Sequence, residues 1–132
     1  MYISMPSTAR IVVLGVAHHV TQRGNRRQQT FFVEADYARY VELIAEGCRS
    51  ARVRVLAWCL IPNHVHLVLI PETTDGLSEA LSSAHQRYTW LVNCPYLSLC
   101  TRPRILFESA ASVVMIKAHA AVHLHHRRRG LL

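Results

Sequence analysis

The sequence has few lysines, no CxxC pair and no long apolar run. Only Lys117 among the 15 cationic residues is a lysine, and the net charge is +7. Hydrophobic residues make up 51% of the 132-residue chain, but no uninterrupted run approaches the about 20 residues of a membrane-spanning helix. The first residues lack the basic start, long apolar core and cleavage site of a secretion signal. We therefore expect one cytoplasmic domain with free thiols and no membrane partner.

The positive charge is concentrated at the two ends of the chain. Residues 1–33 carry four arginines and no acid, and residues 95–132 carry six cations against one acid. The stretch between them has more acids than cations. A basic early loop and a basic tail around a near-neutral core are typical of a protein that binds a polyanion.

Hydrophobic periodicity predicts four strands and two helices. The first strand is expected over residues 10–21, with Gly15 as a bulge, and a helix follows from Asp36 as its N-cap. The remaining predicted elements are strands at 53–60 and 64–70 that form a hairpin, a helix at 76–93 and a strand at 111–116. This order predicts a ferredoxin-like α/β (α+β) fold, βαββαβ, with two helices on one face of an antiparallel sheet.

Two histidines lie one residue apart in "PNHVHLVLI", residues 62–70. Residues two apart on a strand point to the same face, so His64 and His66 can present both imidazoles to one metal ion. Two ligands do not fill a coordination sphere, so a third must come from elsewhere. The spacing alone leaves a second interpretation open, in which one histidine lies in the core and the other on the surface.

Tyr88 lies on the apolar stripe of the second predicted helix. From periodicity alone, packing in the core is the better interpretation of this residue. A tyrosine can also act as a covalent nucleophile when a metal or a base activates it.

Three blocks of the sequence together resemble a known family. They are "VAHHVTQRGNRRQQTFF" from residue 16, "CLIPNHVHLVLIP" from residue 59 and "AHQRYTWLVN" from residue 84. Their order and spacing are similar to those of the single-strand DNA transposases of the HUH endonuclease superfamily, which carry an IS200-like domain, and in particular to the REP-associated tyrosine transposases. The resemblance covers about residues 9–94.

The resemblance implies a metal-dependent transesterification. His64 and His66 would hold Mg²⁺ or Mn²⁺, with Asn93 as a candidate third ligand. Tyr88 would attack the scissile phosphate and form a 5′-phosphotyrosine, so the strand could be cleaved and rejoined without ATP.

The resemblance also implies a DNA partner. It assigns contacts with a hairpin in single-stranded DNA to five residues: Arg23, Asn25, Arg26, Arg27 and Arg87. His19 matches a histidine of the family's strand block, for which a structural role is expected. The family implies a homodimer, in some members with the tyrosine helix serving the partner.

The match fails after Asn93. We expect an HUH transposase domain over residues 1–116, with a divergent last strand, and a basic, histidine-rich tail over 117–132. The family's Gln-Gly-Arg positions correspond to Glu108, Ser109 and Ala110, so a small residue stands in place of the cation and an anion has appeared two residues before it. Two alternatives to an active transposase therefore stay open: a DNA-binding remnant without the chemistry, and a small HxH metallohydrolase.

Overall fold

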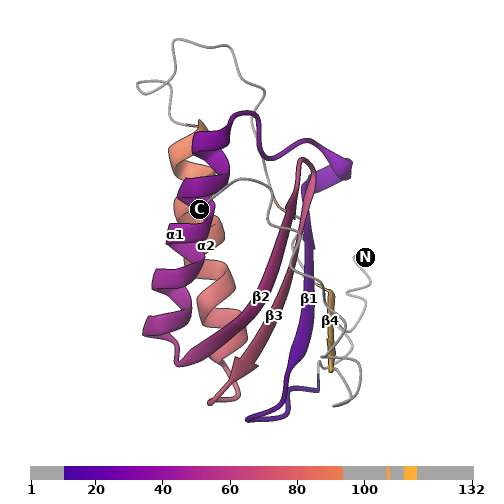
Figure 1. Cartoon of the computed structure of the whole chain (residues 1–132), viewed down its shortest axis with the longest axis vertical. Coiled ribbons are helices and arrows are strands. Elements are labelled where there is room, and N and C mark those ends of the chain that lie inside the picture. Colours follow the sequence, from indigo (N-terminus) through magenta and orange to yellow (C-terminus); the bar gives the residue numbers. More distant parts are fainter. Residues whose placement is uncertain (1–10, 94–106, 108–111, 116–132) are drawn as a thin grey trace, which may run out of the picture.

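The computed structural model describes residues 11–93, 107 and 112–115. In this part of the chain four strands form one sheet in the order β2-β3-β1-β4, with every neighbouring pair antiparallel. Both helices pack on one face of this sheet (Figure 1). The predicted ferredoxin-like architecture is thereby confirmed. The elements are β1 (His18–Arg23), the 3₁₀ turn η1 (Asn25–Arg27), α1 (Glu34–Ser50), β2 (Val53–Ile61), β3 (His64–Pro71), α2 (Gly76–Asn93) and β4 (Ser112–Met115).

The first strand begins later than the sequence pattern predicts. β1 starts at His18, and the preceding residues form a turn in which Gly15 has a φ of 73°. The His18 side chain stabilises this turn, since its Nε2 accepts a hydrogen bond from the N–H of Val13 and its Nδ1 donates to the carbonyl of Val16. Gly15 is therefore a turn residue in the left-handed region, and its prediction as a bulge in a strand is wrong.

α1 also differs at its start. The helix begins at Glu34, and Asp36 lies inside its first turn instead of capping it from outside. The Asp36 carboxylate accepts hydrogen bonds from the backbone N–H groups of Phe32 at 2.8 Å and Val33 at 3.1 Å. As the third residue of the helix, Asp36 thus accepts hydrogen bonds from backbone N–H groups at the helix start. The acidic residue of a capping box plays the same role.

The predicted hairpin, second helix and last strand agree closely with the structure. β2 and β3 are joined by Pro62 and Asn63, and α2 spans the predicted residues 76–93. β4 lies within the predicted 111–116. A β-bulge at Leu56, which the pattern does not predict, shifts the β2–β3 register between Val55 and Ala57.

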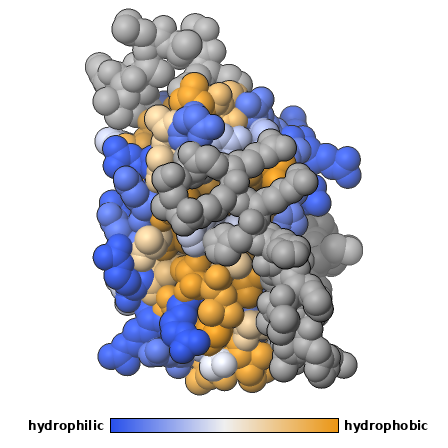
Figure 2. Space-filling view, in the orientation of Figure 1, coloured by the Kyte–Doolittle hydropathy of each residue, from blue (hydrophilic) through white to orange (hydrophobic). Residues whose placement is uncertain are grey.

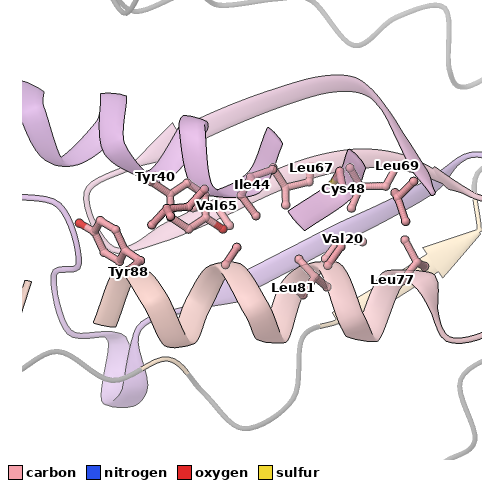
Figure 3. Packing of buried hydrophobic residues seen from close by; sticks show 14 of the residues in the cluster. Val20, Tyr40, Ile44, Cys48, Val65, Leu67, Leu69, Leu77, Leu81 and Tyr88 are labelled. Carbon is pink, nitrogen blue, oxygen red and sulfur yellow. The ribbon is translucent and has the colours of Figure 1, made fainter. Parts of the chain in front are cut away.

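The hydrophobic core lies between the sheet and the helices (Figure 3). Alternate residues of the central strands supply one side of it, among them Val20, Val65, Leu67 and Leu69. The two helices approach closely at Gly47, where a Cβ atom would lie 2.8 Å from the carbonyl oxygen of Ala80. None of the described helices is long and apolar enough to cross a membrane.

A half-buried titratable group, His85, lies beside one end of the core. The Tyr40 hydroxyl forms a hydrogen bond with Nε2 of His85 at 2.8 Å, and the His85 ring stacks on Phe107 with centroids 4.3 Å apart. Burial lowers the pKa of His85 to about 4. The neutral imidazole is therefore the form that the folded chain requires.

This burial predicts acid sensitivity. In the unfolded chain His85 takes up a proton near pH 6.5, whereas in the folded chain it does so near pH 4. Neutral His85 makes its full contribution to the free energy of unfolding above about pH 6.5. This contribution falls as the pH drops toward 4, by up to about 3 kcal/mol. In urea unfolding, the free energy of unfolding should decrease less between pH 7 and pH 4.5 in His85→Gln than in the wild type. Equal losses in the two proteins would contradict this assignment.

Candidate active site

Three imidazoles lie on the face of the sheet that the helices leave open. His19 belongs to β1, and His64 and His66 belong to β3. Each alternates along its strand with core residues such as Val20 and Val65, which have no exposed surface, and alternate side chains of a strand point to opposite faces. The prediction that His64 and His66 share one face is confirmed by this alternation.

The imidazoles are held in a defined arrangement. The rings of His64 and His66 have centroids 4.8 Å apart and are inclined at 77°. Nε2 of His19 lies 3.0 Å from Nδ1 of His66. Nδ1 of His64 lies 2.6 Å from Oδ1 of Asn63. Sequence reasoning assigned no role to Asn63 and only a structural one to His19, because their importance depends on these contacts between side chains.

The surroundings favour neutral imidazoles. Partial burial, followed by the positive charge of Arg23, lowers the pKa of His64. Partial burial and the neighbouring His64, His19 and Arg23 lower the pKa of His66. A neutral imidazole offers a nitrogen lone pair, which is the form that binds a metal ion.

The pair fits a divalent cation only in part. It supplies two nitrogen ligands on one face, but the described residues contain no cluster of three or more His, Cys, Asp or Glu side chains that could hold a metal ion. Asn93, the predicted third ligand, ends α2 on the helix side of the sheet. The structure therefore does not bring Asn93 to the imidazoles.

The loop after β1 is held against the β2–β3 turn by the backbone. The N–H of Gly24 donates to the carbonyl of Asn63 at 3.0 Å, and the N–H groups of Thr30 and Phe31 both donate to the carbonyl of Pro62. A Cβ atom on Gly24 would collide with the carbonyl oxygen of Gln28, so this close packing requires glycine. The loop and the His64 end of β3 form one surface as a result.

Four of the predicted DNA contacts lie at the end of β1 or in this loop and are exposed: Arg23, Asn25, Arg26 and Arg27. Arg23 is paired with His64 in the β1–β3 register, which places it beside the imidazoles. Hydrophilic residues cover the region of η1 (Figure 2, upper right). Arg26 and Arg27 both have positive φ values, 54° and 60°, a strained conformation for arginine that is often found at functional sites.

Arg87, the fifth predicted contact, lies elsewhere. Its guanidinium pairs with the carboxylate of Glu46 on α1 at 2.5 Å, and both side chains are exposed. This ion pair belongs to the helix layer, so the structure does not bring Arg87 to the imidazoles.

Tyr88 is part of the core. Its exposed fraction is 0%, and its hydroxyl donates a hydrogen bond to the carbonyl of Thr30 at 2.7 Å. Its ring packs against Phe31 and against Tyr40 (Figure 3). The sheet separates it from the open face that carries His64. The Tyr88 hydroxyl, which the resemblance assigns to attack on a phosphate held at the histidine pair, therefore does not approach that pair in the folded single chain. The periodicity argument for packing describes this residue correctly.

Comparison with known proteins gives a family model and a fold. The model described as "Transposase IS200 like" matches residues 12–108. No curated protein matches the chain. A solved REP-associated tyrosine transposase bound to a REP hairpin has a TM-score of 0.66 and 18% identity, over 86% of this chain and 63% of that one. The chain thus spans less than two thirds of that protein. A Deinococcus radiodurans R1 protein classed with the transposases has a TM-score of 0.61 and 18% identity, over 88% of this chain and 90% of that one.

The burial of Tyr88 predicts that its hydroxyl contributes to stability. Tyr88→Phe removes the donor to a buried carbonyl and should lower the free energy of unfolding by about 1–3 kcal/mol. Tyr37→Phe is the matched control, because Tyr37 is only half-buried beside the same Phe31 ring, and it should cost less. Urea unfolding measures both. If Tyr88→Phe were as stable as the wild type, the hydroxyl would not be bound in the core.

Proposed function

The chain belongs to the family of IS200-like transposases, and on this premise we propose that it binds a hairpin in single-stranded DNA together with a divalent cation. The proposed site is the open face of the sheet at the His64 end of β3. One observation carries the proposal: the backbone hydrogen bonds between the loop after β1 and the β2–β3 turn join the arginines and the imidazoles into one surface.

The arginines account for the DNA partner. Planar guanidinium groups suit bidentate contacts with phosphates, and Asn25 on the same loop can form hydrogen bonds with base edges. The hairpin in particular is supported by the REP-associated transposase, which was solved with a REP hairpin.

The imidazoles account for the cation. His64 and His66 would hold Mg²⁺ or Mn²⁺, and the ion would act as a Lewis acid on a DNA phosphate. Arg23 lies next to His64 in the register and would neutralise charge on the same phosphate. The remaining ligands would be oxygens of water or DNA, which these cations prefer.

The covalent step is where the candidates differ. In the first candidate the chain binds DNA, and Tyr88 does not attack a phosphate. The burial of Tyr88 supports this candidate. The second candidate is cleavage and rejoining through a 5′-phosphotyrosine at Tyr88, supported by family membership. It requires α2 to release Tyr88 from the core. Dimerisation does not remove this requirement, since a residue without exposed surface cannot reach a partner either. A homodimer stays part of the proposal.

Arginine substitutions test the DNA interface. Arg26→Gln with Arg27→Gln should weaken binding to a hairpin oligonucleotide at least 10-fold and should reduce the slope of log K against log salt by about 1–2. Arg39→Gln is the matched control, because Arg39 is exposed on α1 and pairs with Glu42. Fluorescence anisotropy measures both, with an unpaired strand and a duplex as competitors. Equal losses in both variants, or equal affinity for all three DNA forms, would contradict the proposed interface.

A denaturing gel tests the covalent step. The wild type, incubated with Mn²⁺ and the hairpin oligonucleotide, should show no covalent adduct on this gel, although it binds the hairpin in the anisotropy measurement. An adduct that disappears in Tyr88→Phe would establish the second candidate. Cleavage that persists in Tyr88→Phe without an adduct would instead indicate hydrolysis by water, as in a metallohydrolase.

A further inference from the structure

The open face contains a contact that a pair of metal ligands does not require. Nε2 of His19 on β1 lies 3.0 Å from Nδ1 of His66 on β3. The two rings are inclined by only 14°, and their centroids are 5.2 Å apart. A short nitrogen–nitrogen distance together with so long a centroid distance means that the rings lie edge to edge in nearly one plane. This is the geometry of an in-plane hydrogen bond and not of face-to-face stacking.

A hydrogen bond between two neutral imidazoles needs one donor and one acceptor. If His66 donates from Nδ1, its Nε2 keeps a free lone pair. If His66 instead accepts at Nδ1, its Nε2 carries the proton and cannot bind a cation. The direction of this single bond therefore decides whether His66 can serve as a ligand through Nε2.

His64 has the corresponding arrangement. Its Nδ1 lies 2.6 Å from Oδ1 of Asn63, and a carbonyl oxygen can only accept. His64 thus donates from Nδ1 and keeps its Nε2 lone pair. The two histidines of the pair have the same tautomer if His19 is the acceptor for His66, as Asn63 is for His64.

We infer that His19 is a positioning residue that holds His66 in the Nδ1–H tautomer and leaves its Nε2 free to bind a divalent cation. The inference rests on the proposed role of His66 as a ligand. Hydrogen-bond partners of this kind fix the tautomer and ring orientation of metal-binding histidines, and their loss commonly weakens metal binding 10-fold to 100-fold. Thr21, whose Oγ1 lies 3.4 Å from the same Nδ1, forms the longer and weaker of the two hydrogen bonds.

Nitrogen NMR of the metal-free protein tests the tautomer directly. Long-range ¹H–¹⁵N correlation at pH 7.5 should show His66 protonated at Nδ1 in the wild type. In His19→Phe the ring should return to the mixture of tautomers found in water. His19→Gln, which offers an amide oxygen as acceptor, should restore the Nδ1–H form. Thr21→Val is the matched control on the same strand and face, and it should leave the wild-type pattern intact.

Titration with Mn²⁺ alone, followed by electron paramagnetic resonance, tests the consequence. His19→Phe should bind Mn²⁺ about 10-fold or more weakly than the wild type, and His19→Gln should recover most of that loss. His66 protonated at Nε2 in the wild type would overturn the inference, as would full Mn²⁺ affinity in His19→Phe. A wild type with the expected tautomer but no Mn²⁺ binding would instead contradict the proposed metal site, and the two failures are thus distinguishable.

Discussion

The alternation of side chains along β1 and β3 determines both the hydrophobic core and the position of the candidate site. Val20, Val65 and Leu67 face the helices and have no exposed surface. Because successive residues of a strand point to opposite faces, His19, His64 and His66 must lie on the other side. A shift of either strand by one residue would bury the imidazoles and expose the core, so the core fixes the position of the candidate site.

The same alternation explains why Tyr88 and the histidine pair do not meet. α2 contributes Tyr88 to the core on the helix side, where its hydroxyl binds the Thr30 carbonyl. Thr30 in turn donates its N–H to Pro62 in the β2–β3 turn. Tyr88 therefore supports the turn that precedes His64 from across the sheet. Tyr88 thus has a structural role in shaping the site. A chemical role would first require its hydroxyl to leave the Thr30 carbonyl, and the turn would then lose this support.

Much of the fold could be predicted from the sequence, because patterns of period 2 and 3.6 report directly which face an element buries. α2, the hairpin and the last strand followed from such patterns. The start of β1 could not, since the apolar residues before His18 fit a strand equally well and the His18 side chain stabilises a turn instead.

In the site, spacing predicted the shared face of His64 and His66. Sequence similarity alone led to the expectation that Tyr88 acts at this pair, whereas the apolar stripe of its helix favoured packing in the core, where the structure places it. The contacts of His19 and Asn63 depend on register and ring orientation, which are tertiary properties.

The proposed function places DNA on the open face, beside the imidazoles and the arginine loop. The most direct measurement is a map of backbone amide shifts, by ¹H–¹⁵N NMR, as a hairpin oligonucleotide is added in the presence of Mg²⁺. We expect the largest changes in β1, in η1 and at the His64 end of β3, with little change on the outer surface of α1. Changes concentrated on α1 and around Arg87, with the loop and the imidazole strands unaffected, would contradict it.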